Sequence, residues 1–333
     1  MGDVSVAIPS FGRHHELGRC LEAVEALAPQ PLEILVVLRP DDRDSRLVAA
    51  RGGKRVRVVD VHDPGHLPPL SAALAACRGD VMAVLDDDAV PRASWLERIE
   101  QAFSDPCVAG LGGPVADHQH RPERDLGIGP FTAAMRIRLL RGRTVYRGFR
   151  GLPNPELSRA AGLERPLPAD LVIGCNMAFR RSVLERIGID QGLNRGAAIN
   201  YECDLALGAK RFGKVLFDPR LIVDHYPAPR KGAPSRTVVE RYRYDYTYNL
   251  FYVAGKHFGA PEEAVFRMYM WLVGQGVSPG LVRRLFSGAQ WRRLSLAAHD
   301  PLATARAEGL RAGRAAREAG SIGRTAARRG SVS

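Results

Sequence analysis

Short apolar runs alternate with helical stretches through the first third of the chain. Runs rich in β-branched residues occur at 4–8, 33–38, 56–61, 80–85 and 108–113. Between them, apolar residues at helical spacing recur at 15–27, 70–77 and 94–103. This alternation, with its short connections, predicts an α/β fold whose mostly parallel sheet is covered by helices. Because ligands bind beyond the carboxyl ends of such strands, the residues that follow each run are the first candidates for a site.

The rest of the chain is predicted to hold fewer strands and more helices. Residues 114–169 are rich in Arg, Pro and Gly, which indicates a loop-rich excursion. A strand leading into a helix is expected over 169–188, then a helix over 201–213 and two short strands over 215–227. From residue 235 onward the pattern is helical. We therefore expect one domain over 1–230 and a helical C-terminal region over 231–333.

Basic residues are concentrated at the C-terminal end. The formal net charge is +12, and residues 283–333 contain eleven arginines against three acids. This basic tail has three possible roles: it is simply solvated, it is attracted to an anionic membrane surface, or it binds a polyanionic acceptor. It lacks interleaved aromatic residues, so nucleic acid is not expected as a partner. No apolar run approaches the roughly 20 residues that a membrane-spanning helix needs, and the start MGDVSVAIPS does not resemble a secretory signal.

The number and spacing of the cysteines indicate the redox environment of the protein. Five of them, at 20, 77, 107, 175 and 203, are scattered and form no CxxC pair. This pattern argues against a zinc site and against a disulfide framework, and it favours a reducing environment. We therefore expect a cytoplasmic protein, with peripheral contact at the inner face of the membrane left open.

The stretch VLDDDAVP, residues 84–91, places three carboxylates directly after an apolar run. Three negative charges at the end of a buried strand are costly unless something neutralises them. An EF-hand calcium loop fails, because Val90 and Pro91 stand where a ligand and the obligatory Gly are needed. A structural helix cap would need one Asp rather than three. A hard-cation site open to phosphate oxygens fits best, with Asp86 and Asp88 on the same side if strand geometry continues.

Several motifs occur in an order that resembles the family 2 glycosyltransferases of the GT-A (Rossmann-like) fold. They are IPSFGR, LDDDAVP followed by WLERIEQAF, GCNMAFRR, YECDL and FDPRLIVDH. The similarity covers about residues 4–227. It implies a metal-dependent, inverting enzyme of hexosyltransferase type that takes a sugar from a UDP-, GDP- or dTDP-sugar, and it makes 1–230 the nucleotide-sugar-binding and catalytic domain.

The resemblance also implies a set of site residues. Asp88 and His225 would hold Mn²⁺ or Mg²⁺ on the donor diphosphate, where the metal acts as a Lewis acid. Other residues after the strands would contact the nucleotide or the donor sugar: Pro9, Ser10, Arg13, Arg39, Asp42, Asp86, Asp87, Gly174 and Asn176.

The second strand departs from the family pattern. Relatives often end this strand with an acidic residue for the nucleobase, whereas here Leu38 and Arg39 stand there and Asp41 or Asp42 comes later. The identity of the base is therefore left open. A basic residue common before the fourth strand is also missing, so neutralisation of the diphosphate would rest on the metal and on Arg13 or Arg39.

Inverting transfer needs a carboxylate that takes the proton from the acceptor hydroxyl. The motif YECDL places Glu202 and Asp204 two residues apart, so on a helix their side chains diverge by about 200°. Aligned on the Asp-Leu pair, Glu202 falls in the slot of the family's catalytic Asp, and we predict it as the general base. Asp204 is then a helix-start or supporting residue.

Two other functions and the acceptor stay open. A sugar-1-phosphate nucleotidyltransferase would want a Gly-rich basic run after the first strand, which PSFGRHHELG does not provide. A non-catalytic scaffold protein would have no reason to retain Asp86, Asp88, Glu202 and His225 together. The acceptor is a glycan, a lipid-linked molecule or a small molecule. The aromatic RYRYDYTYNLFY and the apolar FRMYMWLVG suit packing within the protein, a homodimer interface or a lipid.

Overall fold

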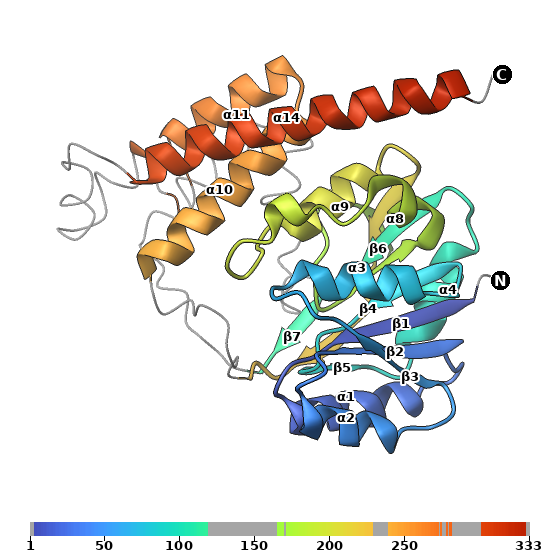
Figure 1. Ribbon diagram of the computed structural model, residues 1–333. Coiled ribbons are helices and arrows are strands. Elements are labelled where there is room, and N and C mark those ends of the chain that lie inside the picture. The colour runs from blue at the N-terminus through green and yellow to red at the C-terminus, as the bar shows by residue number, and fades with distance from the viewer. Residues whose placement is uncertain are drawn as a thin grey trace. The chain divides into compact units, whose positions relative to one another are not determined.

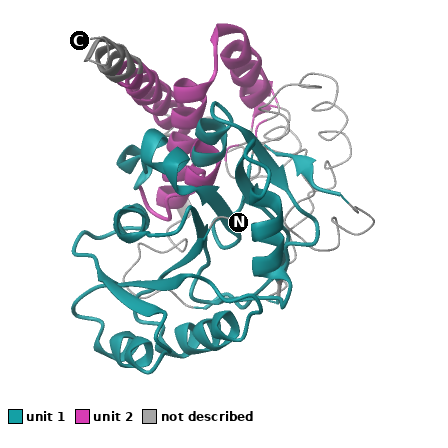
Figure 2. Cartoon of the chain, turned by 90° about the vertical axis from the view of Figure 1, so that its right-hand side faces the viewer, with its two compact units in different colours: residues 1–121, 147–194, 205–233 teal, residues 122–146, 195–204, 234–333 magenta. Residues whose placement is uncertain are grey.

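The computed structural model of the chain describes residues 3–118, 165–169, 171–228, 239–272, 274, 278, 280–281 and 301–330. By its internal contacts the chain divides into two compact units (Figure 2). Unit 1 comprises residues 1–121, 147–194 and 205–233, and unit 2 comprises 122–146, 195–204 and 234–333. The sequence suggests a single boundary near residue 230, whereas these contacts also group 195–204 with the C-terminal residues. Most of the predicted loop-rich region 114–169 lies outside the described residues.

Unit 1 is built on an eight-stranded sheet in the order β3-β2-β1-β4-β9-β6-β10-β8 (Figure 1). Its strands are β1 (Val4–Pro9), β2 (Glu33–Leu38), β3 (Val56–Asp60), β4 (Val81–Val84), β6 (Val108–Gly112), β8 (Leu167–Pro168), β9 (Met177–Arg180) and β10 (Lys214–Phe217). The pairs β1–β2, β2–β3, β1–β4 and β6–β10 are parallel. β9 runs antiparallel between β4 and β6. The predicted mostly parallel sheet is confirmed.

Helices cover this sheet on both sides. They are α1 (His14–Glu25), α2 (Arg43–Ala50), α3 (Leu67–Ala76), α4 (Trp95–Phe103) and α8 (Arg181–Ile187), with the short 3₁₀ helix η2 (Gln191–Leu193). α1 and α3 lie on opposite faces of the sheet (Figure 1). Apolar residues one helical turn apart in α1, such as Leu17 and Leu21, and the fully buried Trp95 of α4 pack with β1, β2 and β4 in one core. Burial of each such side chain stabilises the fold by about 1.5–3 kcal/mol.

A second, three-stranded sheet completes unit 1. It holds β5 (Ala89–Pro91), β11 (Val223–His225) and β7 (Val115–Asp117) in the order β5-β11-β7. In the antiparallel pair of β5 with β11, Ala89 lies opposite His225. Because Ala89 follows Asp88 directly, this register brings the predicted histidine ligand beside the carboxylate triplet.

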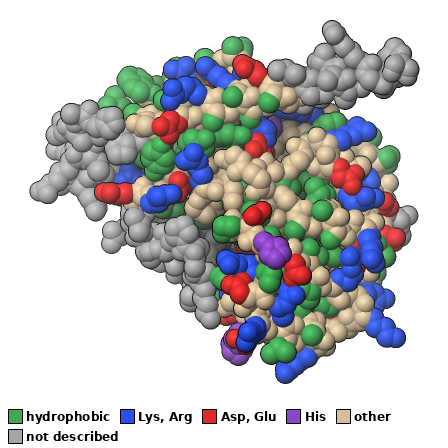
Figure 3. Space-filling view, in the orientation of Figure 1, with side chains coloured by type: hydrophobic (Ala, Val, Ile, Leu, Met, Phe, Trp, Pro, Cys, Tyr) green, Lys and Arg blue, Asp and Glu red, His purple; other side chains and the backbone are tan. Residues whose placement is uncertain are grey.

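The surface of unit 1 carries charges of both signs. Basic and acidic side chains are intermixed on the face drawn in Figure 3. Ion pairs at the surface of unit 1 include Arg46–Asp60 at 2.6 Å and Lys214–Asp105 at 3.1 Å. Such pairs are worth about 0–1 kcal/mol each, so the apolar core rather than the surface carries the stability.

In the part of unit 2 that the structure describes, the long helices are α10 (Val239–His257), α11 (Ala260–Leu272) and α14 (Pro301–Gly330). α10 and α14 pack backbone to backbone, because Gly309 and Gly313 lie against the carbonyl groups of Tyr248 and Tyr252. A Cβ atom at either glycine would collide with those oxygens. No helix among the described residues is long and apolar enough to cross a membrane.

The aromatic stretch of α10 forms core. Tyr248, Phe251 and Tyr252 are buried, and the ring of Phe251 meets that of Phe266 in α11 edge to face at 5.0 Å. This confirms packing within the protein for these residues. Met268 and Trp271 of α11 are 42% and 62% exposed, so they do not take part in that core.

Most predicted elements of unit 1 are present. The run at 33–38 is β2 with the same bounds, and the other four runs are β1, β3, β4 and β6 with ends shifted by at most one residue. The helix α2 is missing from the prediction. Its sequence RDSRLVAA follows RPDD and looks like a charged loop, but Asp42 caps it by accepting a hydrogen bond from the Ser45 N–H at 3.3 Å.

Candidate functional site

The carboxylate triplet occupies a turn at the carboxyl end of β4. The strand ends at Val84, and Asp86–Asp88 connect it to β5. Asp87 and Asp88 are 3% and 5% exposed, whereas Asp86 is half-buried. Two buried acidic groups side by side need positive or hydrogen-bonding partners, and the fold supplies an arginine and an imidazole from two separate segments.

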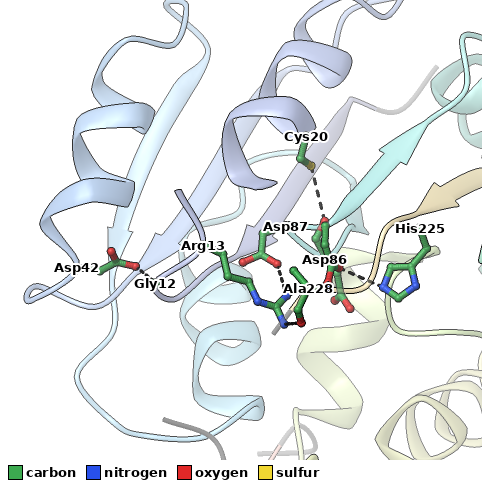
Figure 4. A network of polar contacts seen from close by, with 9 residues as sticks. Gly12, Arg13, Cys20, Asp42, Asp86, Asp87, His225 and Ala228 are labelled. Carbon is green, nitrogen blue, oxygen red and sulfur yellow. Dashed lines mark hydrogen bonds and ion pairs between the residues drawn. The ribbon is translucent and has the colours of Figure 1, made fainter. Parts of the chain in front are cut away.

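The first partner is Arg13, the residue before α1. Its Nη1 donates to Asp87 Oδ1 at 2.7 Å and to Asp88 Oδ2 at 2.9 Å, and its Nη2 donates to the carbonyl of Ala228 at 2.9 Å (Figure 4). One nitrogen thus serves two neighbouring carboxylates. The condition of continued strand geometry is not met, because β4 ends at Val84.

The second partner is His225 at the end of β11. Its Nε2 lies 3.1 Å from Asp88 Oδ1. The backbone N–H of Ala228 donates to the other oxygen, Oδ2, at 3.1 Å. Oδ1 itself is buried and accepts no hydrogen bond of good geometry from the described residues. Asp88 therefore keeps an acceptor oxygen available beside an imidazole.

The two buried carboxylates differ in their electrostatics. Burial raises the pKa of Asp87 to about 6, although the guanidinium of Arg13 opposes this rise. Burial also acts to raise the pKa of Asp88, but His225, Arg13 and the Ala228 N–H outweigh it and hold that pKa below its ordinary value. Asp88 is therefore the carboxylate held ionised, as a metal ligand must be.

The residues present fit a divalent cation. The ion pairs of the described residues give the three carboxylates one arginine and one imidazole, so negative charge remains uncompensated. Carboxylate oxygens suit Mg²⁺ and Mn²⁺, and imidazole suits several transition metals. Asp86, Cys175 and His225 also offer three ligand atoms within 4.8 Å of one another. Cys175 was not expected on sequence grounds, since scattered cysteines argue against a metal site.

The loops after β1 and β2 are tied together. Pro9 ends β1, and the N–H of the buried Ser10 donates to the Val37 carbonyl at 3.0 Å. Asp42, besides capping α2, accepts from the Gly12 N–H at 2.6 Å (Figure 4). Asp42 therefore orders the loop that presents Arg13, and its contact with a nucleobase stays a prediction.

Arg39 contacts residues other than the triplet. It pairs with the exposed Asp41 at 3.1 Å, and its guanidinium sits over the ring of Phe11 at 5.0 Å. At the end of β2, Arg39 thus has one acidic and one aromatic neighbour. Its predicted role toward a diphosphate stays a prediction, while Arg13 is the arginine that the fold brings to Asp87 and Asp88.

The predicted donor-sugar residues Gly174 and Asn176 lie in the turn before β9. The Asn176 side chain is fully buried: it donates to the carbonyls of Leu221 at 2.7 Å and Pro114 at 3.1 Å, and accepts from Trp95 Nε1 at 2.9 Å. Its amide is therefore satisfied inside the protein. We assign this side chain a positioning role, in which it holds the Gly174–Cys175 turn against β6 and the β10–β11 connection.

The predicted base lies at the start of α9 (Tyr201–Ala209). Its first four residues, with Glu202, group with unit 2. Asp204 is buried in that unit, 2.7 Å from His257 Nε2 and 2.9 Å from Lys256 Nζ. Burial acts to raise the pKa of Asp204, but these two partners outweigh it and lower that pKa. Asp204 is therefore held by Lys256 and His257, and its role as a helix-start or supporting residue stays a prediction.

A buried thiol close to the triplet was also not anticipated. Cys20 Sγ in α1 donates to the carbonyl oxygen of Asp86 at 3.6 Å (Figure 4). Burial raises the pKa of this thiol well above its ordinary value. Cys20 thus supports the turn as a neutral group. The only sequence signal for it is its apolar position on the buried face of α1.

Known proteins similar to this chain are glycosyltransferases by their names. A pre-mycofactocin glycosyltransferase of Mycobacterium tuberculosis (strain CDC 1551 / Oshkosh) is 33% identical over 112 residues, 32% of this chain and 22% of that protein. The aligned stretch thus spans about a fifth of that relative. Mannosyltransferase PcManGT of Pyrobaculum calidifontis, solved with GDP-Man and Mn²⁺, has a TM-score of 0.54 at 16% identity, covering 95% of this chain and 87% of that one.

A second solved structure is glucosyl-3-phosphoglycerate synthase of Mycobacterium tuberculosis with Mg²⁺ and UDP, at a TM-score of 0.46 and 15% identity, covering 74% of this chain and 77% of that one. The family model described as "Glycosyl transferase family 2" matches residues 5–188, which is more than half of the chain. The chain therefore belongs to glycosyl transferase family 2.

Proposed function

We propose that the chain transfers a glycosyl group, with inversion, from a nucleoside diphosphate sugar to an acceptor hydroxyl, with Mn²⁺ or Mg²⁺ as cofactor. The observation that carries this proposal is Asp88. It is a buried, ionised carboxylate at the carboxyl end of a parallel strand, and one of its oxygens lacks a hydrogen bond beside His225. The Pyrobaculum relative, which shares the fold, was solved with GDP-Man and Mn²⁺, and this supports the same class of donor.

Asp88 and His225 would hold the cation, with Asp86 next to it on the nucleotide side. When bound, the cation supplies Lewis-acid stabilisation of the negative charge on the departing nucleoside diphosphate. Arg13 keeps Asp87 and Asp88 oriented through its shared Nη1, and its Nη2 fixes the strand end near Ala228. Pro9, Ser10, Arg39 and Asp42 stay proposed nucleotide contacts, and Gly174 stays a proposed donor-sugar contact.

Glu202 is the proposed general base. Its carboxylate would take the proton of the acceptor hydroxyl while that oxygen bonds to the anomeric carbon. The bond between the anomeric carbon and the phosphate oxygen breaks, and its electron pair leaves with the nucleoside diphosphate. The structure supports this choice indirectly, because the alternative carboxylate Asp204 is buried against Lys256 and His257.

Trp271 and Met268 are the proposed points of peripheral membrane contact. They are exposed apolar residues of α11, and the basic Arg267 lies beside them on the same helix. An interfacial surface combines such apolar side chains with basic ones. Trp271→Ala should weaken binding to anionic lipid vesicles, and raising the salt should weaken it further, while Leu47→Ala, an exposed residue of α2, should leave it unchanged. Equal binding by all three proteins would contradict the contact.

Calorimetric titration with UDP, GDP and dTDP, each with and without Mn²⁺, tests the donor proposal. We expect one nucleotide to bind in a metal-dependent way, and Asp88→Asn to abolish that dependence. Asp105→Asn is the matched control, since Asp105 is exposed and pairs with Lys214. Metal-independent binding would return the triplet to a structural role. Binding of none of the three nucleotides would refute the transferase proposal.

A further inference from the structure

Three metal-ligating side chains of different chemistry meet in unit 1. Asp86 lies in the turn after β4, Cys175 in the turn before β9, and His225 at the end of β11. One atom of each lies within 4.8 Å of the other two: a carboxylate oxygen, the sulfur and a ring nitrogen. These residues are 50 or more positions apart along the chain, so the tertiary structure alone assembles them.

We propose that Asp86, Cys175 and His225 form a binding site for a thiophilic divalent cation such as Zn²⁺ or Co²⁺, with Cys175 as its thiolate ligand. The inference rests on the proposed function, because His225 is shared with the proposed Mn²⁺ or Mg²⁺ position. It differs in the ligand set. Oxygen ligands suit Mg²⁺ and Mn²⁺, whereas a soft sulfur ligand selects for metals such as zinc.

The geometry suits a small tetrahedral ion. Zinc binds sulfur at about 2.3 Å and nitrogen or oxygen at about 2.0–2.2 Å, so its ligand atoms lie about 3.3–3.8 Å apart. Starting from separations of up to 4.8 Å, side-chain rotations that move each atom by about 1 Å or less bring the three together. Three protein ligands and one open position form the arrangement of catalytic rather than structural zinc sites.

Burial and charge also favour a cation here. Cys175 is 6% exposed, whereas Asp86 and His225 are half-buried, so the sulfur lies at the closed end and the other two ligands at the open end. Asp88 Oδ1, the buried oxygen without a hydrogen bond, lies 3.1 Å from the ring of His225 and is a separate sign that positive charge belongs there. The thiol releases its proton to water when the ion binds, so carboxylate and thiolate together balance the two positive charges.

This site would make the enzyme sensitive to the metal supplied. When Asp86, Cys175 and His225 hold an ion, His225 can no longer bind a second metal ion together with Asp88. Asp86 can then no longer contact the nucleotide. We therefore expect Zn²⁺ to inhibit transfer that Mn²⁺ or Mg²⁺ supports, and Cys175→Ser to relieve this inhibition.

Cobalt spectroscopy on the full, metal-free chain tests the site directly. Titration with Co²⁺ should produce a thiolate-to-cobalt charge-transfer band in the near ultraviolet that saturates at one equivalent. Cys175→Ser should lose this band, while Cys107→Ser, which alters the exposed cysteine, should keep it. His225→Asn should weaken Co²⁺ binding by about 10- to 100-fold or more, since even indirect partners of a metal ligand cost that much.

The cobalt experiment needs neither the sugar donor nor the acceptor. No charge-transfer band in the unaltered protein, or a band that survives Cys175→Ser, would overturn the inference. Alkylation of the unaltered protein provides a second readout that no folding defect can obscure: Zn²⁺ should slow labelling of Cys175 at least tenfold and leave Cys107 unchanged. Equal protection of both cysteines would also overturn it. If instead the nucleotide titrations fail while the cobalt band is present, the transferase proposal falls and the metal site stands.

Discussion

Nη1 of Arg13 lies 2.9 Å from Oδ2 of Asp88, so the carboxylate proposed to hold a divalent cation is already paired with a fixed positive charge. Both side chains are largely buried. The same nitrogen also binds Asp87 at 2.7 Å. Arg13 therefore both stabilises the turn and would compete by charge with a metal ion.

Arg13→Gln should destabilise the metal-free protein and strengthen its binding of Mn²⁺. Removing one partner of a buried ion pair costs about 3–5 kcal/mol. A unit charge roughly 5 Å from a divalent ion, at an effective dielectric constant near 20, opposes binding by about 6–7 kcal/mol before screening, so a gain of about tenfold or more in Mn²⁺ affinity is expected. Urea unfolding with and without Mn²⁺ measures both effects.

Arg46→Gln is the control for that experiment, because Arg46 pairs with Asp60 at the surface. It should change stability by less than about 1 kcal/mol. Unchanged Mn²⁺ affinity in Arg13→Gln would contradict competition between the arginine and the metal.

Glu202→Gln should lower kcat by about 10²–10⁴-fold, since a positioned general base contributes that factor. Calorimetric affinity for the nucleotide should stay the same, because the acceptor side alone is altered. The rate of sugar transfer at saturating donor measures the first quantity. Glu185→Gln, an exposed residue of α8 paired with Arg181, serves as the control. A variant that retains nearly full kcat would exclude Glu202 as the base.

Asp204→Asn should destabilise the protein at neutral pH by about 3–5 kcal/mol, because it leaves Lys256 without its buried partner. The pKa of Asp204 is lowered in the folded state from its ordinary value of 3.8. Its contribution is therefore fully present above pH 3.8 and is lost as the pH falls through the lower folded pKa. The difference in unfolding free energy between the unaltered protein and the variant should narrow in that acid range.

The exposed Asp44 of α2 offers the matched comparison for the acid range. Asp44→Asn should differ little from the unaltered protein at any pH. If the stability gap for Asp204→Asn stays constant down to the lowest pH at which the protein folds, the ion pair with Lys256 and His257 does not lower the pKa.

Asn176→Ala should destabilise unit 1 by about 3 kcal/mol or more. The change removes the partner of the Leu221 carbonyl and of the Trp95 indole N–H, and each such buried group costs about 1–3 kcal/mol. The Pro114 carbonyl loses one bond but still accepts from the Val223 N–H at 3.3 Å. Trp95→Tyr is a partial comparison, because it removes the Trp95–Asn176 hydrogen bond and also changes the packing. Thermal or urea unfolding measures the loss. A change below about 1 kcal/mol would show that the Gly174–Cys175 turn does not depend on this amide.

The local elements were largely predictable. β2 and the other buried strands stand out because runs of Ile, Val and Leu bounded by polar turns are strand signals in any context. α2 was missed because its charged sequence carries a weak pattern, and the cap at Asp42 is recognisable only once the helix is known. The ends of α3 also differ, since the helix starts at Leu67 with prolines in its first turn, where proline is tolerated.

The site was predictable in part. The cluster at Asp86–Asp88 is visible because three adjacent carboxylates after an apolar run have few structural explanations. The family resemblance implied that Asp88 and His225 share a metal ion; the structure brings their side chains to 3.1 Å, and their role as metal ligands stays a prediction. The hydrogen bonds of Arg13 to both Asp87 and Asp88 could not be foreseen, because they depend on where β4 ends.

The sequence by itself determined that this chain is an α/β protein with acidic residues at a strand end, since burial patterns, turn residues and neighbouring carboxylates are local properties. Only the tertiary structure decided that β9 enters antiparallel between β4 and β6, and that Asp86, Cys175 and His225 converge. The reason is physical. Strand order and register are set by pairings between segments as far apart as Ala89 and His225, and the free energy of such pairings depends on the whole packed core rather than on any local pattern.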